Sequence, residues 1–255
     1  MTKEIEKYWN QTSKKYQDNS NISTSSAHYG PFAPNEDKLK LLGNIKGKKI
    51  LEIGCGGGQC SIALSKKGAN CTGLDISEEQ LKFARKLSIK ENQNIIFIKK
   101  DIQTLKGIKS NTYDVVFSAF AIQYVPNLSM IFREVYRVLK KDGVFVFSFD
   151  HPFYSIISPS TLKITQSYNT LKRFEETTTG VDGTKKKFIA YSRKISDTFN
   201  SLVNSGFYVE RIIEPFDEKT ENAWKDNYWK KIYPLKATRM IGPTIIFKVS
   251  KLKRK

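Results

Sequence analysis

Short apolar runs alternate with amphipathic segments between residues 48 and 150 of this chain. Uninterrupted apolar runs suit strands that are covered on both sides, and they lie near 49–53, 70–74, 95–99, 113–118 and 143–149. Between them, apolar residues at helical spacing predict helices near 58–67, 78–90 and 128–140. We expect Gly143 to make the last turn from helix to strand. Strands and helices that alternate in this way predict an α/β fold with a doubly wound parallel sheet.

The segments around this core have a different pattern. Residues 1–46 precede it, and we expect them to form a lid with helices at 4–16 and 35–42. Residues 150–193 are rich in Ser, Thr and Pro, and a loop of this length inside a compact domain is usually functional. We expect a substrate cap there, with one or two short strands and a turn at 181–184.

The C-terminal part, residues 194–255, predicts one helix and two further strands, at 194–204, 207–213 and 244–249. A chain of 255 residues can bury one substantial core. We therefore expect a single domain over 1–255, in which the lid and the cap flank a cofactor-binding core at 47–149.

The most informative stretch is Ile-Leu-Glu-Ile-Gly-Cys-Gly-Gly-Gly, at residues 50–58. It places four glycines within five positions, directly after a predicted strand and before a predicted helix. Glycines let the backbone turn sharply and approach a ligand closely, and the helix N-terminus presents unpaired N–H groups to that ligand. The stretch therefore predicts a nucleotide-type binding site.

Acidic residues near this loop indicate which nucleotide it binds. Asp75 ends the second predicted strand 21 residues after Gly54, where a Rossmann-like unit places an acid on a ribose diol. A dinucleotide fingerprint needs glycine at position 59, but the chain has Gln59 there. Glu52 puts a carboxylate beside the loop, which suits a cationic ligand better than a pyrophosphate. These features favour S-adenosylmethionine and argue against a nicotinamide oxidoreductase.

The pattern resembles that of the class I S-adenosylmethionine-dependent methyltransferases, in particular the small-molecule group with a type 11/25-like domain. The resemblance is strong over about residues 48–150. It implies a Rossmann-like sheet of about seven strands in the order 3-2-1-4-5-7-6, with strand 7 antiparallel. It also implies S-adenosylmethionine as the methyl donor and S-adenosylhomocysteine as a product.

The resemblance places the cofactor contacts at the ends of the first four strands and in the lid. Asp75 is expected to accept hydrogen bonds from both ribose hydroxyls, and Asp101 to accept one from the adenine amine. Gln59 is placed to bond the carboxylate end of the methionine, over which Tyr29 closes. The expected cofactor-binding residues are Tyr29, Glu52, Gly54, Cys55, Gly56, Gly58, Gln59, Asp75, Ile76, Gln80, Asp101, Ile102, Ser118 and Ala119.

His151 is the candidate catalytic residue, because it follows the fifth strand directly in the sequence Asp-His-Pro-Phe. Pro152 disfavours the helical conformation at His151 and keeps the chain extended at the mouth of the sheet. His151 can act as a general base, line the acceptor pocket without that role, or bond a loop carbonyl structurally. The cap supplies candidate pocket walls in Tyr154, Tyr168, Phe174 and Tyr191.

Charge bears on the identity of the acceptor. The formal net charge is +18 and the pI is about 9.7, which suits nucleic acid as a partner. The lysines are scattered, however, and they are not interleaved with aromatic residues in a recognisable RNA-binding module. We therefore expect in-line methyl transfer to a small organic acceptor. An RNA (tRNA) methyltransferase and a non-catalytic cofactor-binding subunit are the alternatives.

Other kinds of site are not expected. The three cysteines, Cys55, Cys60 and Cys71, lack the spacing of a zinc site, and no catalytic metal is predicted. No apolar run reaches the ~20 residues of a membrane span, and the N-terminus lacks the apolar segment of a signal peptide. We expect a cytoplasmic enzyme without a membrane partner, and no pattern indicates an oligomeric state.

Overall fold

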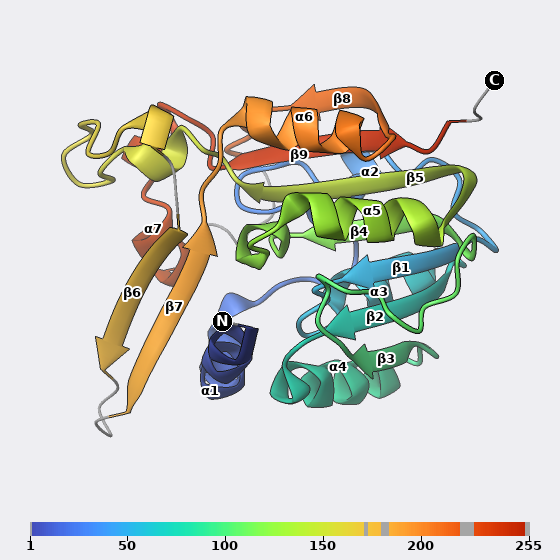
Figure 1. Ribbon diagram of the computed structural model, residues 1–255. Coiled ribbons are helices and arrows are strands. Elements are labelled where there is room, and N and C mark those ends of the chain that lie inside the picture. Colours follow the sequence, from blue (N-terminus) through green and yellow to red (C-terminus); the bar gives the residue numbers. More distant parts are fainter. Residues whose placement is uncertain (1, 171–172, 180–183, 220–226, 253–255) are drawn as a thin grey trace.

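The computed structural model describes residues 2–170, 173–179, 184–219 and 227–252. Seven strands form one mixed sheet in the order β3-β2-β1-β4-β5-β9-β8 (Figure 1). Neighbouring strands are parallel from β3 to β5, whereas β9 is antiparallel to both β5 and β8. Because β8 and β9 are the sixth and seventh strands of this sheet along the chain, the expected order and its antiparallel last strand are confirmed.

The strands of the sheet are β1 (Lys49–Ile53), β2 (Asn70–Asp75), β3 (Ile96–Lys99), β4 (Tyr113–Ala119), β5 (Leu139–Asp150), β8 (Tyr208–Ile213) and β9 (Thr244–Ser250). A separate antiparallel hairpin consists of β6 (Arg173–Thr179) and β7 (Lys185–Tyr191). The α-helices are α1 (Thr2–Ser20), α2 (Glu36–Leu39), α3 (Gln59–Lys66), α4 (Glu78–Lys90), α5 (Leu128–Val138), α6 (Ile195–Asn204), α7 (Asn227–Ile232) and α8 (Leu235–Thr238). Short 3₁₀ turns are η1 (Ile122–Tyr124), η2 (Tyr154–Ile156) and η3 (Tyr168–Thr170). Of the helices in the described ranges, none combines the length and apolarity needed to span a bilayer.

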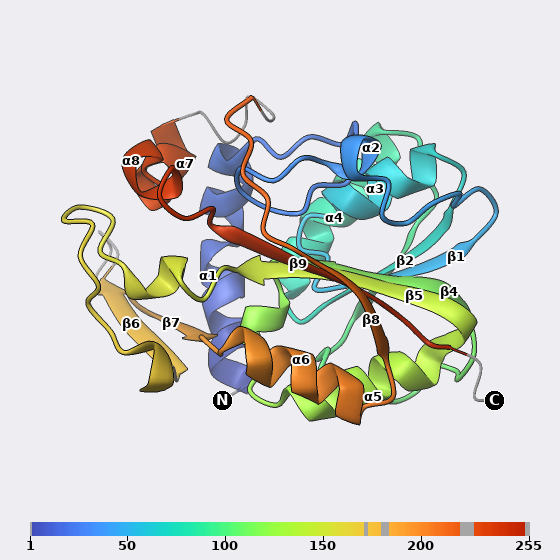
Figure 2. The same ribbon diagram turned by 90° about the horizontal axis from the view of Figure 1, so that it is seen from above.

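Helices cover both faces of the sheet. Figure 2 shows α2, α3 and α4 on one side of it and α5 and α6 on the other. Successive residues of a strand serve opposite faces. Phe145 and Phe147 on β5 therefore join the core that includes Phe132 of α5, whereas Val146 between them joins the core that includes Leu64 of α3. The buried strand residues thus build two cores, and α1 lies across the end toward which the parallel strands point (Figure 1).

Helix α1 is longer than predicted. The sequence predicts a helix that ends near Tyr16, but α1 continues to Ser20. Gln17 and Ser20 are buried, and the Ser20 carbonyl oxygen accepts a 2.8 Å hydrogen bond from Trp229 Nε1. Packing against distant residues therefore stabilises a last turn whose own composition does not favour a helix.

The turn between α5 and β5 differs from the one expected at Gly143. Helix α5 ends at Val138 and β5 begins at Leu139, so the strand starts before the glycine. The left-handed residue is Asp142, at φ 60°, rather than Gly143. Glycine is needed at position 143 for space, because a Cβ there would lie 2.8 Å from the Lys140 carbonyl oxygen.

The region after β5 contains the two strands expected there, β6 and β7, and the hairpin stands beside α1 (Figure 1). Lys187 Nζ on β7 lies 3.4 Å from Glu4 Oε1 on α1, which links the hairpin to the lid. Of the turn predicted at 181–184, residues 181–183 lie outside the described residues. The hairpin and α1 flank the carboxyl ends of the parallel strands, where α/β sheets bind their ligands.

Candidate active site

A cavity of about 1260 Å³ lies at the carboxyl ends of β1, β2, β4 and β5, with walls from α1 and from the β6–β7 hairpin. A single ligand pocket usually has ~300–1,000 Å³, so this one has room for a nucleoside and a second small molecule. Most of the expected cofactor residues line it, namely Glu52, Gly54, Cys55, Gly56, Gln59, Asp75, Ile76, Gln80, Asp101, Ile102 and Ala119.

The glycine loop after β1 forms one end of the cavity. Gly54 and Gly56 have φ values of 71° and 50°, in the left-handed region that favours glycine. A Cβ on Gly54 would lie 2.2 Å from the Ala121 Cβ, so a larger residue does not fit there. The N–H groups of Gly54 and Cys55 both donate to the Leu74 carbonyl oxygen, at 2.7 and 2.9 Å, which fixes the loop against β2.

Asp75 ends β2 beside this loop. Its Oδ2 accepts a 2.8 Å hydrogen bond from Gly56 N, and its Oδ1 accepts a 2.9 Å bond from Ser77 N. Burial raises the pKa of Asp75, although these backbone N–H groups act in the opposite direction. A carboxylate offers about four acceptor positions, and backbone N–H groups of Gly56, Ser77 and Ile76 act on this one, so Asp75 keeps acceptor capacity for a ribose hydroxyl. The cap of α4 is Ser77, whose Oγ accepts from Gln80 N, so that role does not occupy Asp75.

Glu52, on β1, lines the cavity beneath the loop. Ser61 Oγ donates a hydrogen bond to its carboxylate, and burial is the main reason that the pKa of Glu52 is raised to about 7. A positive group of a ligand would stabilise this carboxylate, and S-adenosylmethionine carries two, an ammonium and a sulfonium. The residues at this end therefore fit the charge of that cofactor as well as its sugar.

We expect S-adenosylmethionine to bind roughly five- to tenfold more tightly at pH 7.5 than at pH 6, because its ammonium expels a proton from Glu52. With its pKa raised, Glu52 stabilises the ligand-free fold at low pH and loses that contribution as the pH rises through about 7. A bound cation lowers this pKa, so the gain in affinity appears over the same pH range. Ser61 and Asp75 are the polar groups that act on Glu52.

Titration calorimetry at the two pH values measures this effect. Glu52→Gln cannot titrate and should bind with nearly equal affinity at both. A variant that keeps the full pH dependence would show that another group is responsible.

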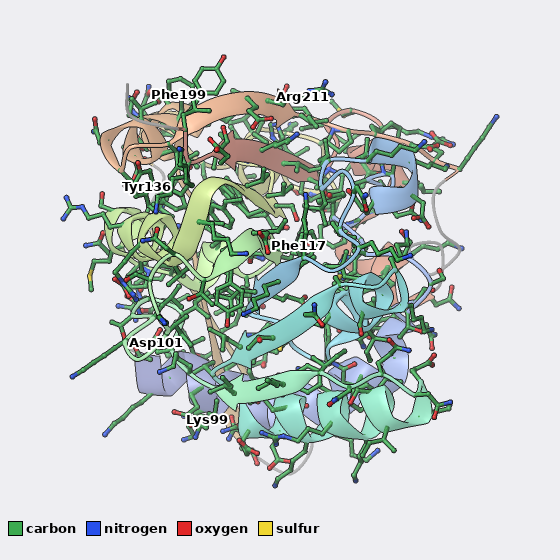
Figure 3. All side chains as sticks on the ribbon, turned by 90° about the vertical axis from the view of Figure 1, so that its right-hand side faces the viewer. Lys99, Asp101, Phe117, Tyr136, Phe199 and Arg211 are labelled. Carbon is green, nitrogen blue, oxygen red and sulfur yellow. The ribbon has the colours of Figure 1, made fainter. Side chains whose placement is uncertain are left out.

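The expected adenine end lies beyond β3, where Figure 3 labels Asp101. Asp101 Oδ1 accepts a 2.9 Å hydrogen bond from Gln103 N, and Gln103 Nε2 lies 3.3 Å from Thr2 Oγ1 of α1. Ile76 and Ile102 also line this part of the cavity. A carboxylate beside two apolar side chains suits a flat base with an exocyclic amine. The contacts of these residues with adenine remain predictions.

Gln17 on α1 fastens the lid to the glycine loop, a role that the helical pattern does not reveal. Its Oε1 accepts a 2.7 Å hydrogen bond from Gln59 Nε2, and its Nε2 donates a 2.6 Å bond to Gln80 Oε1. Gly57 permits this approach, because a Cβ there would lie 2.5 Å from Gln17 Nε2. The lid therefore positions two of the residues that are expected to meet the cofactor.

We expect Gln17→Ala to weaken binding of S-adenosylhomocysteine about 5- to 30-fold, because two buried amide hydrogen bonds together contribute about 1–2 kcal/mol. Calorimetry measures the change. Lys14→Ala, at an exposed position of the same helix, is the matched control and should bind normally. Equal affinities for the two variants would mean that the lid does not support the cofactor site.

Tyr29, expected to contact the cofactor, does not line the cavity; it is fully buried in the core. Its hydroxyl donates to the Glu36 carboxylate, which also accepts a 3.0 Å hydrogen bond from Leu41 N. These bonds fix the backbone that follows α2. Helix α2 is a single turn, shorter than the helix predicted at 35–42. The neighbouring His28 lines the cavity instead, and burial lowers its pKa to about 4.

Gly58 and Ser118 also lie outside the cavity lining, and their contacts with the cofactor stay predictions. Ser118 Oγ donates a 2.9 Å hydrogen bond to the Ile53 carbonyl oxygen within the sheet. A Cβ on Gly58 would lie 2.9 Å from Phe97 Cζ, so this glycine makes room for packing between the helix and the sheet. Both residues therefore support the site from behind.

His151 is not positioned as a general base. Its Nδ1 accepts a 3.1 Å hydrogen bond from Phe153 N, and its Nε2 lies 3.0 Å from Glu214 Oε1. Since Nδ1 accepts, Nε2 carries the hydrogen and donates it to Glu214. Both nitrogens are engaged and the ring does not line the cavity. The structure therefore favours the structural alternative for His151, and its role as a base stays a prediction.

The carboxylate that faces the cavity after β5 is Asp150, which was not among the expected site residues. Tyr233 Oη donates a 2.8 Å hydrogen bond to Asp150 Oδ1, and burial raises the pKa of Asp150 to about 6. Among the candidate cap walls, Tyr154 and Phe174 line the cavity, whereas Tyr168 and Tyr191 do not. Asp150 and Tyr154 therefore line the cavity at and after the end of β5, two strands away from β1 and its glycine loop.

Comparison with known proteins adds independent information. Residues 51–147 match a family model described as a methyltransferase domain. An uncharacterised protein of Haemophilus influenzae is 28% identical over 201 residues, which are 74% of this chain and 79% of that protein. The ubiquinone biosynthesis O-methyltransferase of Shewanella pealeana is 35% identical over 127 residues, 47% of this chain. The match spans about half, 54%, of that enzyme's length.

Among solved structures, an S-adenosylmethionine-dependent methyltransferase from Mesorhizobium loti shares the fold, with a TM-score of 0.59 at 21% identity. The superposition covers 83% of this chain and 94% of that one. The matched domain, the strand order and the acidic glycine-loop site point to one class. That class is the class I S-adenosylmethionine-dependent methyltransferases, and the matched methyltransferase domain covers residues 51–147 of the chain.

Proposed function

We propose that this protein transfers the methyl group of S-adenosylmethionine to a small organic acceptor by in-line displacement. The observation that carries the proposal is one continuous cavity, lined by the glycine loop and Asp75 after β1 and β2 and by Asp150 and Tyr154 at and after the end of β5. Bound S-adenosylmethionine supplies a methyl group on a positively charged sulfur, which is a good leaving group. The contribution of the chain is to hold donor and acceptor in line, which can account for much of the acceleration.

The residues between the two ends fit this role. Ala119 and Ala121 line the cavity where β4 ends, at the switch point beside β1. Their small side chains leave room for a methyl group between the two ligands. We propose that Asp75 holds the ribose, Glu52 the cationic end and Asp101 the adenine, while α1 and the β6–β7 hairpin restrict access of water.

A covered cavity favours a small acceptor over RNA. Ring side chains from α1 and the hairpin, including Tyr8, Trp9 and Phe188, wall the space next to the donor end. The relative from Shewanella pealeana, a ubiquinone biosynthesis O-methyltransferase by name, supports a small organic molecule as the acceptor class. Steep loss of activity on RNA as salt rises would instead support the RNA alternative.

Two measurements test the proposal. Calorimetry should show binding of S-adenosylhomocysteine, and incubation with S-adenosylmethionine and a panel of small amines, phenols, alcohols and acids should release that product. Failure to bind S-adenosylhomocysteine would overturn the proposal at its first step. Binding without turnover on any member of the panel, together with turnover on bulk tRNA, would overturn the acceptor class.

A further inference from the structure

The acceptor end of the cavity combines a carboxylate with hydrogen-bond acceptors and aromatic rings. From this arrangement, and resting on the proposed methyl transfer, we infer that the acceptor is a primary or secondary amine carried on an apolar or aromatic body. Its nitrogen binds at Asp150, between Tyr154 and Gln123. The proposal names the atom that is methylated, which the fold alone does not determine.

Asp150 is available to a cationic ligand. Its Oδ1 receives one hydrogen bond, from Tyr233 Oη at 2.8 Å, and other acceptor positions of the carboxylate remain. None of the ion pairs found among the described residues includes Asp150. The groups that face it are the neutral hydroxyls of Tyr233, Tyr154 and Tyr124. A carboxylate shielded from bulk water without a cation favours a ligand that brings its own N–H donors or positive charge.

Two further polar atoms, on residues that line the cavity, have no partner within the described part of the chain. They are Tyr154 Oη and Gln123 Oε1, on side chains that are only 7% and 4% exposed. The Gln123 side chain also bonds Tyr124, whose pKa is raised chiefly by burial and further by the charge of Asp150. Gln123, Tyr124 and Asp150 therefore belong to one polar cluster. Because buried polar groups are normally hydrogen-bonded, this cluster indicates a ligand.

The donor count favours an amine over an alcohol. Gln123 Oε1 and the Asp150 carboxylate can only accept, whereas the Tyr154 hydroxyl can do either. A protonated primary amine offers three N–H donors, which can serve all three groups at once. A hydroxyl offers one donor and would leave an acceptor unpaired, and an acidic acceptor would bring a second negative charge beside Asp150.

Aromatic side chains that line the cavity near Asp150 form a surface that can bind a cation. Trp9 on α1 lies 5.5 Å from Tyr124 and 5.5 Å from Tyr16, measured between ring centroids. Tyr16 lies 6.2 Å from Trp229, which lies 6.2 Å from Tyr233, the hydrogen-bond donor to Asp150. All of these residues line the cavity. Aromatic faces attract ammonium groups and also pack against an apolar body, so this surface suits both parts of such an acceptor.

The transfer step then balances. An ammonium acceptor gives one proton to the Asp150 carboxylate, which leaves a neutral amine beside a neutral carboxylic acid. The nitrogen lone pair forms the new N–C bond while the C–S bond breaks and its electron pair stays on sulfur. The product is a methylammonium and a neutral thioether, and Asp150 returns its proton to water when the products leave.

The test uses two matched series that differ only in the reacting group: 2-phenylethylamine, 2-phenylethanol and phenylacetate, and tryptamine, tryptophol and indole-3-acetate. Calorimetry in the presence of S-adenosylhomocysteine measures acceptor binding, and mass spectrometry with S-adenosylmethionine detects the methylated product. We expect an amine to bind at least about tenfold more tightly than its alcohol, a difference of about 1.4 kcal/mol, and to be methylated on nitrogen.

Single substitutions at Asp150 and Tyr154 measure how much each side chain contributes to the preference for an amine. Asp150→Asn should abolish the preference for the amine, and Tyr154→Phe should reduce it, while both keep normal affinity for S-adenosylhomocysteine. Asp142→Asn, at the exposed start of the same strand, is the matched control and should behave as the wild type. Preference for an alcohol or an acid, absence of amine binding at millimolar concentration, or an undiminished preference in Asp150→Asn would each overturn the inference. If the wild-type protein did not bind S-adenosylhomocysteine at all, the proposed function itself would be refuted.

Discussion

Replacing Asp75 by alanine is expected to raise the dissociation constant of S-adenosylhomocysteine at least about 100-fold, which corresponds to ~2.7 kcal/mol. Two hydrogen bonds from ribose hydroxyls to a carboxylate contribute about 1.5–3 kcal/mol each, so their loss is sufficient. The variant also leaves the N–H groups of Gly56 and Ser77 without the acceptor that holds the glycine loop. Calorimetry with the purified variant measures the change.

Two further variants make this result specific to Asp75. Asp75→Asn keeps one acceptor oxygen and should have an intermediate affinity. Glu79→Ala, at an exposed position in the first turn of α4, removes a nearby acid and should leave the affinity unchanged. If Asp75→Ala bound within about threefold of the wild type, less than ~1 kcal/mol, the carboxylate would have no part in holding the sugar.

Gly54→Ala is expected to abolish cofactor binding and to lower the melting temperature. The new Cβ would lie 2.2 Å from the Ala121 Cβ, and the backbone at φ 71° is unfavourable for alanine. Both strands that flank the methyl-transfer region would have to move apart. Differential scanning fluorimetry and calorimetry report the two effects on the same samples.

Gly47→Ala is a matched control, because Gly47 has a φ of 73° but nothing lies within 4 Å of the added Cβ. It should lose only the ~1–2 kcal/mol of the left-handed backbone and keep its cofactor affinity. Adding Ala121→Gly to Gly54→Ala removes the contacting methyl group and should restore part of the binding. If Gly54→Ala and Gly47→Ala were equally mild, the loop would be more adaptable than its packing indicates.

The inner strands of the sheet, such as β4 and β9, could be predicted because they are mostly buried and apolar, whereas the edge strands β3 and β8 are largely exposed. The glycine loop and Asp75 could be predicted because their chemistry lies in consecutive residues. The hydrogen bonds of Gln17 to Gln59 and Gln80 could not be predicted, because these residues are separated from Gln17 by 42 and 63 positions in the sequence. Nothing local distinguishes Gln17 from the other polar residues of α1.

Four residues expected in the site lie outside the cavity lining. Each lies next to a residue that does line the cavity; the pairs are Tyr29 and His28, Gly58 and Gly57, Ser118 and Ala119, and His151 and Asp150. Ser118 and Ala119 lie in strand β4, where successive side chains point to opposite sides, so an error of one residue selects the wrong face. Gly58 has left-handed backbone, at φ 77°, and no side chain, so this explanation does not apply to it. Sequence pattern located the segments that form the site, but only packing shows which neighbour faces inward.

The position of α1 has a consequence for the order of events in a catalytic cycle. Helix α1 borders the cavity at two places: Gln17, in its last turn, bonds Gln59 and Gln80, and Trp9, two turns earlier, lines the cavity. A movement of α1 that admits one ligand would therefore also disturb the binding site of the other. In the proposed reaction, entry and exit of the two ligands on the side of α1 are therefore expected to be coupled.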